Sequence, residues 1–142
     1  MVAERLDAKY AMGSAVGVAD GISKAGVKQR GVAVFGDSSF FHTSLPAICN
    51  AVYNRSNIIM IVLDNGGAVT SGFQPNAGVG INALGQDAPK LNMAEIARAC
   101  GVKQVHAVGP DNLESALGQA FNEALRSPDV SLIVVRTVSD RV

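Results

Sequence analysis

The sequence has no tryptophan, two cysteines and few charged side chains for its 142 residues. Charged residues make up 17% of the chain and hydrophobic residues 48%, a composition that excludes a disordered chain. Lysine plus arginine and aspartate plus glutamate both number 12, and no basic stripe with interleaved aromatic residues is present. This balance gives no indication of a nucleic-acid partner or of an anionic membrane surface.

The two cysteines, Cys49 and Cys100, each lie in an apolar pattern of helical spacing. Because nothing marks the chain as secreted, we expect two buried free thiols rather than a disulfide. The absence of a CxxC pair indicates that the chain has no iron–sulfur or zinc site of its own. The first residues lack the apolar segment of a signal peptide, and the longest apolar run, 58–63, has the length of a strand. We therefore expect a cytoplasmic protein with no membrane partner.

Four short apolar segments rich in β-branched residues predict strands, and those at 31–35 and 57–63 are expected to be buried on both faces. The other two cover residues 104–108 and 131–136. Helical patterns alternate with them, at about 10–25, 40–54, 91–100 and 110–126. Such alternation is typical of a parallel sheet covered by helices on both faces. The predicted fold class is therefore α/β, with a doubly wound parallel sheet.

The length fits a single domain over residues 1–142. The chain opens almost directly on a helix, so the sheet appears without the first strand expected ahead of it. We interpret the sequence as a fragment or one piece of a larger enzyme. Gly13, Gly17 and Gly21 recur every four residues, which predicts a helix face packed closely on another backbone. Residues 68–90 are rich in Gly, Asn and Pro without a period, and loops of that length are usually functional.

Two polar loops follow the first two predicted strands, GDSS at 36–39 and DNGG at 64–67. Asp37 and Asn65 are separated by about one helix and one strand, so adjacent parallel strands would bring both side chains to the carboxyl edge, where such sheets bind ligands. A carboxylate, an amide oxygen and a backbone carbonyl suit Mg²⁺. The helix that begins near residue 39 presents free N–H groups to an anion, and Gly36 lets the backbone come close to it.

Each of these side chains also has an ordinary explanation. Asp37 could be a helix N-cap and Asn65 a turn residue, while Ser38 and Ser39 favour a helix start with or without a phosphate. His42, one turn into the helix, is either a ligand-facing or an ordinary partly buried histidine. We expect His106, on the third strand, to be structural.

The loop pair resembles the thiamine-diphosphate motif, which begins GDG or GDS and ends NN or DN. A longer match is similar to the thiamine-binding region of indolepyruvate ferredoxin oxidoreductases. It includes GDSSFFHT at 36–43, LDN at 63–65, AMGS at 11–14 and SGFQP at 71–75, where the family has CMGAS and TGHQP in the last two places. The resemblance covers roughly residues 10–136.

The resemblance implies a site and an activity. Asp37 and Asn65 would each give Mg²⁺ a side-chain oxygen, and Gly67 a backbone carbonyl. The residues implied in cofactor binding are Gly13, Ser14, Gly36, Asp37, Ser38, Ser39, Asn65 and Ser71, with His42 as the catalytic candidate. Enzymes of the family decarboxylate an aryl 2-oxo acid on thiamine diphosphate, pass electrons to iron–sulfur clusters and ferredoxin, and release an acyl-CoA.

The departures from the family pattern limit what this chain can do alone. Phe73 stands where the family has histidine, and Ser71 where it has threonine, so the substrate or a proton transfer could differ. The chain has neither cluster-binding cysteines nor a candidate for the glutamate that activates the pyrimidine ring. We therefore expect a pyrimidine-binding domain and an iron–sulfur or ferredoxin domain elsewhere in the enzyme, and no activity in the isolated chain.

Two other functions stay open. One is a non-redox thiamine-dependent decarboxylase or an acetolactate-synthase-like lyase. The other is a non-catalytic nucleotide-binding module, against which the lack of a GxGxxG or GxxxxGKS/T loop counts.

Overall fold

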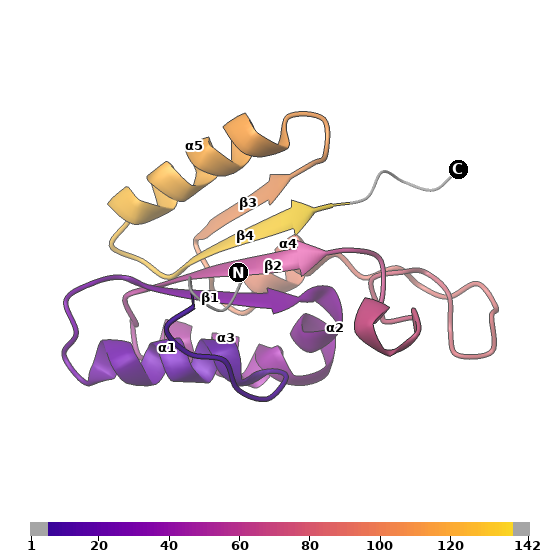
Figure 1. Cartoon of the computed structure of the whole chain (residues 1–142), viewed down its shortest axis with the longest axis horizontal. Helices are drawn as coiled ribbons and strands as arrows, with labels where there is room; N and C mark the ends of the chain where they lie inside the picture. The colour runs from indigo at the N-terminus through magenta and orange to yellow at the C-terminus, as the bar shows by residue number, and fades with distance from the viewer. Residues whose placement is uncertain (1–5, 138–142) are drawn as a thin grey trace.

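The computed structural model describes residues 6–137, in which four parallel strands form one sheet with helices on both faces (Figure 1). The strands are β1 (Gly31–Gly36), β2 (Ile58–Asp64), β3 (Gln104–Val108) and β4 (Ser131–Arg136). Their order across the sheet is β1-β2-β4-β3, and every neighbouring pair is parallel. The predicted α/β class with a parallel sheet is confirmed.

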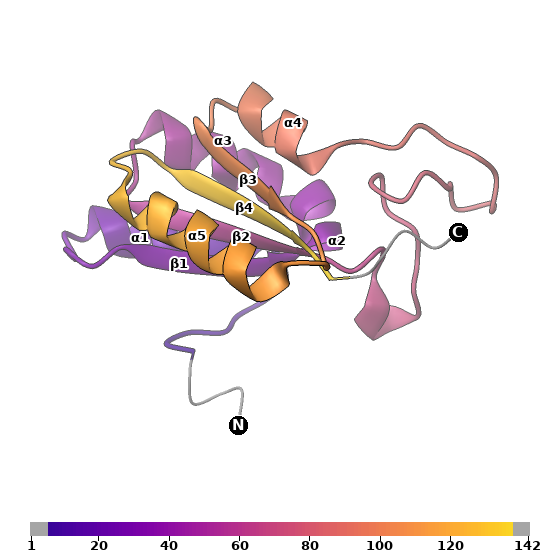
Figure 2. The same cartoon turned by 90° about the horizontal axis from the view of Figure 1, so that it is seen from above.

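Helices cover the two faces of the sheet unequally. Helices α1 (Ser14–Lys24), α3 (Leu45–Tyr53) and α4 (Met93–Ala99) pack over the larger core, whereas α5 (Leu113–Arg126) packs over a smaller one on the opposite face. Figure 2 shows α3 and α4 on one side of the strands and α5 on the other. None of the helices within residues 6–137 is long and apolar enough to cross a membrane.

Strand β1 is buried on one face only. Ala33 and Phe35 lie in the core with α1 and α3, but Val32 and Val34, on the other face of the strand, are each 44% exposed. The reason is that α5 covers β3, β4 and part of β2 and does not reach β1. The prediction that residues 31–35 are buried on both faces is therefore wrong.

The glycine row of the first helix is not a packing face. Helix α1 begins at Ser14 and is the first helix or strand within residues 6–137. A Cβ atom built on Gly17 or Gly21 would meet no heavy atom within 4 Å, so the prediction of close packing at these two positions is wrong. Gly13 differs, because its Cβ would lie 2.2 Å from Oγ1 of Thr43.

Both cysteines are free thiols, but their burial differs from expectation. Cys49 is exposed on α3, and Cys100, directly after α4, is partly buried. A hydrogen bond joins the two thiols, which lie side by side although they are distant in the sequence. The prediction of burial is thus wrong for Cys49.

Candidate functional site

The carboxyl ends of β1 and β2 bring the two polar loops together. Gly36, the last residue of β1, is in register with Leu63, so Asp37 and Asp64 are the next pair of positions at that edge. The long loop 68–90 contains a short 3₁₀ turn, η3 (Val69–Ser71), and two isolated β-bridges, and it extends beyond the same edge (Figure 1).

Asp37 is the residue that joins the two loops. Its carboxylate is 3% exposed, and Oδ2 accepts the backbone N–H of Gly67 at 2.8 Å. Oδ1 accepts the backbone N–H of Ser38 at 2.6 Å and the Ser38 hydroxyl at 3.3 Å. The N-cap of this helical segment is Gly36, so Asp37 is its first residue and not its N-cap. A carboxylate can accept about four hydrogen bonds or metal contacts, so an oxygen lone pair remains for a cation.

Asn65 follows β2 in the neighbouring loop. Its side-chain Oδ1 is buried and has no hydrogen-bond partner among residues 6–137. A buried acceptor left without a partner is unfavourable by about 1–3 kcal/mol. An oxygen placed in this way fits a metal ligand, which would supply the missing interaction.

The Gly67 carbonyl, the third oxygen implied for the metal, is partly engaged. It accepts the backbone N–H of Val69 at 2.9 Å, which leaves one of its two lone pairs. With Asp37 and Asn65 it forms an all-oxygen set of the kind that Mg²⁺ prefers. The described residues contain no cluster of three His, Cys, Asp or Glu side chains that could hold a metal ion.

Open space adjoins the end of β1, where a diphosphate would have to lie. A Cβ built on Gly36 would meet no heavy atom within 4 Å, and the backbone there is extended, with φ of −84°. From Asp37 onward the chain is helical through α2 (Asp37–Ser39), a π turn η2 (Phe40–Ser44) and α3. The predicted helix over 40–54 thus begins with a π turn, a feature frequent at functional sites.

Negative charge is crowded at this edge. Burial raises the pKa of Asp64, and the nearby Asp37 carboxylate adds to the rise, while the Gly66 N–H, Arg136 and Lys90 oppose it. The Arg136 Nε lies 3.9 Å from the Asp64 carboxylate. A cation between the two loops would reduce the repulsion between Asp37 and Asp64.

Asn76 is a site residue that the sequence reasoning missed. It is 6% exposed, and its Nδ2 donates to the Ser38 hydroxyl at 2.9 Å, while its Oδ1 accepts the Gly78 N–H at 2.9 Å. The long loop is thereby fastened over the start of the helix. An asparagine two residues before a glycine is the pattern of such a side-chain-closed turn, and this signal could have identified it.

The loop also packs on the π turn. A Cβ on Gly78 would lie 2.8 Å from the Phe41 ring, and the rings of Phe40 and Phe41 meet edge to face with centroids 5.2 Å apart. His42, the catalytic candidate, is exposed in the same turn. Its role stays a prediction.

The other predicted cofactor residues lie at the margin of this edge. Ser39 is buried beside Ser38. The Ser14 hydroxyl donates to the Ala11 carbonyl at 2.6 Å, and the exposed Ser71 hydroxyl lies 2.8 Å from Oε1 of Gln74, so both side chains are engaged in their own turns. The predicted cofactor contacts of Ser14 and Ser71 stay predictions.

Phe73 lies over the second polar loop. It has a left-handed backbone with φ of 59° and is 51% exposed. A Cβ on Gly67 would lie 3.7 Å from its ring, so the aromatic side chain is next to the proposed metal loop.

A cavity of about 460 Å³ opens on the other side of β2 from Asp37. It lies at the ends of β2, β4 and β3 and combines apolar walls with three charged side chains. Its charged lining residues are Asp64, Lys90 and Arg136, and its apolar lining includes Leu91, Met93, Val108 and Val134. It adjoins the loop pair and is large enough for a small organic acid.

Comparison with known proteins places these features in a family. Residues 8–135 match the family described as thiamine pyrophosphate enzyme, C-terminal TPP binding domain. The chain is 38% identical over 130 residues to the indolepyruvate oxidoreductase subunit IorA of Methanothermobacter marburgensis. It is 39% identical over 144 residues to the protein of the same name from Pyrococcus horikoshii.

Solved structures agree with the fold. The 2-oxoglutarate:ferredoxin oxidoreductase from Magnetococcus marinus superposes with a TM-score of 0.75 at 15% identity, over 88% of this chain and 45% of that one. Benzoylformate decarboxylase from Polynucleobacter necessarius gives a TM-score of 0.64 at 27% identity, over 88% of this chain and 23% of that one. The chain spans 21% and 22% of the length of the two IorA relatives, and they match 92% of it.

Proposed function

The chain belongs to the thiamine pyrophosphate enzymes through their C-terminal TPP-binding domain, and from this premise we propose that it holds Mg²⁺ and the cofactor's diphosphate at the carboxyl ends of β1 and β2. In this proposal Asp37 and Asn65 give side-chain oxygens to the metal and Gly67 its carbonyl. Phosphate and water oxygens would complete the octahedral shell. The diphosphate would lie beside Gly36, at the start of the helical segment. Bound cofactor supplies the electron-sink chemistry of decarboxylation, and the protein positions it.

The observation that carries this proposal is the buried Oδ1 of Asn65, for which residues 6–137 offer no partner. The Asp37 carboxylate has backbone partners, so a structural role alone would explain its burial. Its burial therefore does not distinguish a metal ligand from a structural residue. The Asn65 oxygen makes no hydrogen bond within the described fold, so a structural role does not explain its burial. Its position at the end of β2, next to the strand that leads into Asp37, supports a ligand held between the two loops.

The experiment is calorimetric titration of the chain with thiamine diphosphate, in Mg²⁺ and in chelator. We expect binding only with Mg²⁺, and Asn65→Ala to weaken it at least about ten-fold, which corresponds to about 1.4 kcal/mol. The free energy of unfolding without ligand should stay unchanged or rise by up to about 3 kcal/mol, because the substitution removes a buried oxygen that has no internal partner. Asn122→Ala, on the exposed surface of α5, is the matched control and should change neither quantity. Undiminished binding in Asn65→Ala would overturn the ligand set.

For the whole protein we propose a 2-oxo acid:ferredoxin oxidoreductase that converts an aryl pyruvate-like acid and CoA to an acyl-CoA. Support comes from the identity of 38% and 39% to the two IorA proteins. The pyrimidine-binding and iron–sulfur parts would then lie in other domains or subunits, with Phe73 contributing an apolar wall near the cofactor.

A non-redox decarboxylase is the second candidate, and the 27% identity to benzoylformate decarboxylase favours it. The complete protein, supplied with indolepyruvate or benzoylformate, distinguishes the two. Product formation that requires CoA and is accompanied by reduction of ferredoxin supports the oxidoreductase. Aldehyde and carbon dioxide released without an electron acceptor support the decarboxylase. A nucleotide-binding module would give a heat of binding when titrated with ATP or NAD in the same calorimeter. Under our proposal neither titration should give any.

A further inference from the structure

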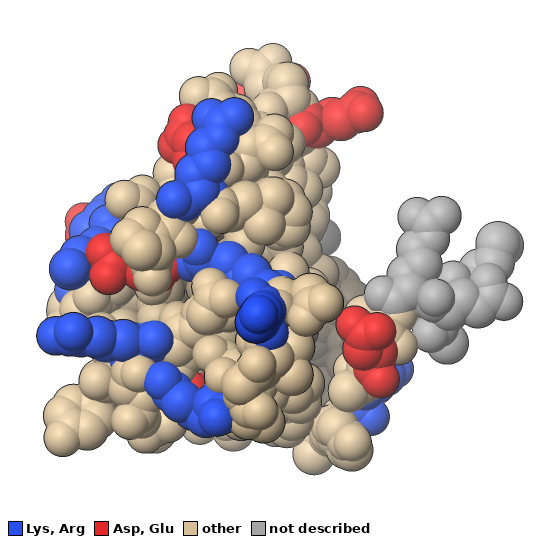
Figure 3. All heavy atoms as spheres, turned by 90° about the vertical axis from the view of Figure 1, so that its left-hand side faces the viewer, with Lys and Arg blue, Asp and Glu red and all other residues tan. Residues whose placement is uncertain are grey.

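Positive charge gathers at the amino ends of the strands, the edge opposite the loop pair. The connections that lead into the strands, residues 25–30, 54–57, 100–103 and 127–130, contain a single acid, Asp129. Because all four strands are parallel, these connections meet at one edge. The cations of this edge are Lys28, Arg30, Arg55 and Lys103, together with Lys24 and Arg126 at the last positions of α1 and α5. Figure 3, which looks at this side of the molecule, shows Lys and Arg side chains over much of it.

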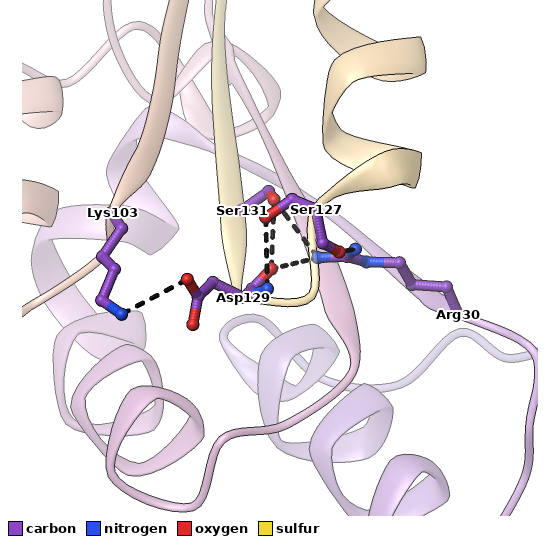
Figure 4. Close-up of polar contacts among 5 residues, drawn as sticks. All are labelled: Arg30, Lys103, Ser127, Asp129 and Ser131. Carbon is purple, nitrogen blue, oxygen red and sulfur yellow. Dashed lines mark hydrogen bonds and ion pairs between the residues drawn. The ribbon is translucent and has the colours of Figure 1, made fainter.

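Arg30 is committed to the fold. Its guanidinium donates to the carbonyls of Ser127, Asp129 and Ile58 and lies 3.2 Å from the Ser131 hydroxyl. In Figure 4 it reaches the turn before β4, while the Asp129 carboxylate points away toward Lys103. Arg30 thus ties three strand entrances together and is not available to a partner.

Lys103 and Arg55 are available. The Lys103 ammonium lies 3.3 Å from the Asp129 carboxylate, with side chains 72% and 44% exposed, and ion pairs as exposed as this are weak. Arg55 is exposed, and its guanidinium has no hydrogen bond or ion pair with any residue of 6–137. The two cations border a hollow of about 250 Å³, whose other lining residues are Val52, Gly101, Pro128, Asp129 and Val130. Tyr53, the last residue of α3, lies between the lining residues Val52 and Arg55 in the sequence and is 87% exposed.

The backbone at Arg55 is one that glycine would adopt more easily. Arg55 has φ of 52°, and its N–H donates to the Val52 carbonyl while the Ser56 N–H donates to the Ala51 carbonyl, both at 3.0 Å. This is the Schellman ending of a helix, in which the left-handed position favours glycine.

The chain has glycine at the equivalent position of two other helices. Gly26 after α1 and Gly101 after α4 have φ of 88° and 93°. At the end of α3 an arginine therefore adopts a strained backbone conformation, and its side chain forms no hydrogen bond or ion pair with the described residues that would offset the strain. Strained positions of this kind concentrate at functional sites.

We propose that this amino-edge face, centred on the hollow between Arg55 and Lys103, docks an acidic segment of a partner protein, with aspartate or glutamate side chains placed between the two cations. Docking there leaves the loop pair at the opposite edge open. The chain spans about a fifth of its relatives' length, so partner domains are present in proteins of this kind. Asp129 interrupts the positive surface, which disfavours a continuous nucleic-acid backbone.

The test uses the whole chain and a fluorescent hexaglutamate peptide, with binding followed by anisotropy at low salt. We expect saturable binding that disappears near 1 M salt, where the screening length is about 3 Å. Arg55→Gln and Lys103→Gln should each weaken binding about two- to five-fold, the range for exposed ion pairs, and the double variant about ten-fold or more. Arg55→Lys, which keeps the charge, should retain binding. Lys90→Gln removes the same charge at the opposite edge and should leave binding of the peptide unchanged.

A second measurement separates function from folding. Arg55→Gly should leave Tm equal or raise it by up to about 4 °C, because glycine relieves the left-handed strain, while weakening the peptide as Arg55→Gln does. A Tm several degrees lower would show that the fold needs Arg55 and would overturn the proposal. If an oligothymidine binds as tightly as the hexaglutamate or more tightly, and the same variants lose that binding, the partner is a nucleic acid and the proposal of a protein partner is wrong. Absence of binding by either probe would also refute the proposal, and none of these outcomes bears on cofactor binding.

Discussion

The carboxylate of Asp37 accepts the backbone N–H of Gly67 at 2.8 Å, across 30 positions of sequence. This bond fixes the loop after β1 against the loop after β2, and it orients the second loop independently of any ligand. The carboxylate also accepts the Ser38 N–H. Asp37 therefore has two roles, one in the fold and one proposed at the metal, and a substitution there is expected to affect both.

Asp37→Asn should lower both stability and cofactor affinity. An amide keeps one acceptor oxygen but turns an NH₂ group toward a backbone N–H, so we expect a loss of about 1–3 kcal/mol in the free energy of unfolding. Mg²⁺-dependent cofactor binding should fall at least about ten-fold. Chemical denaturation and calorimetry measure the two effects.

Asp64→Asn is the matched control at the neighbouring strand end, where the carboxylate accepts a 3.4 Å bond from the Gly66 N–H and lies 3.9 Å from the Arg136 Nε. It should leave stability unchanged or raise it at neutral pH, because burial already disfavours the Asp64 charge. If both variants weaken cofactor binding equally, charge alone is at work and Asp37 is not a ligand.

Gly36→Ala tests the diphosphate position without disturbing the fold. The backbone φ of −84° suits alanine, and the added methyl would meet no protein atom within 4 Å. We expect no loss of stability, but weaker binding of thiamine diphosphate because the methyl would occupy the open space. A variant that binds the cofactor as the wild type does would place the diphosphate elsewhere.

The sequence predicted those features that depend on local chemistry. The two strand segments 104–108 and 131–136 agree with the structure residue for residue, because short β-branched runs between turns leave little alternative. Asn92 caps α4 by accepting the N–H groups of Ala94 and Glu95, a role that asparagine favours at helix starts. The meeting of the two polar loops followed from the parallel order of adjacent strands.

Features that depend on neighbours distant in the sequence were not predictable in this way. Exposure of Val32 and Val34 is decided by how far α5 reaches across the sheet, which no pattern within β1 contains. The solvent exposure of Gly17 follows from the rotation of α1, which turns Val16 and Ala19 inward. Segregation of charge to the amino edge is likewise invisible in a balanced composition.

Two glycines of the same row should respond in opposite directions to alanine. Gly13→Ala places a methyl 2.2 Å from Oγ1 of Thr43 at φ of 84°, so we expect a loss of about 2 kcal/mol or more. Gly17→Ala adds a methyl in open space within a helix and should stabilise by about 0.5–1 kcal/mol. Urea denaturation of the isolated chain measures both. A destabilising Gly17→Ala would contradict the exposure of that face.

The thiol of Cys100 has an unusual acidity. Burial, followed by the hydrogen bond and charge interaction with Cys49, raises the pKa of Cys100 from 9.0 to about 11. Unfolding would return the pKa to 9.0, so the unfolded state binds fewer protons between these two values. The stabilising contribution is complete below pH 9 and is lost as pH rises toward 11.

Cys100→Ser should therefore remove one component of the alkaline destabilisation. Denaturation midpoints of the wild type and of Cys100→Ser, compared between pH 8 and pH 10.5, should converge as pH rises, because only the wild type carries the shifted thiol. The comparison within each pH cancels the titration of lysines and tyrosines.

Alkylation gives an independent readout, since the thiolate is the reactive form. At pH 8 iodoacetamide should modify the exposed Cys49 well before Cys100, as followed by peptide mass spectrometry. Equal rates at the two thiols, or parallel pH curves for the two proteins, would show that the pKa of Cys100 is not raised by its surroundings.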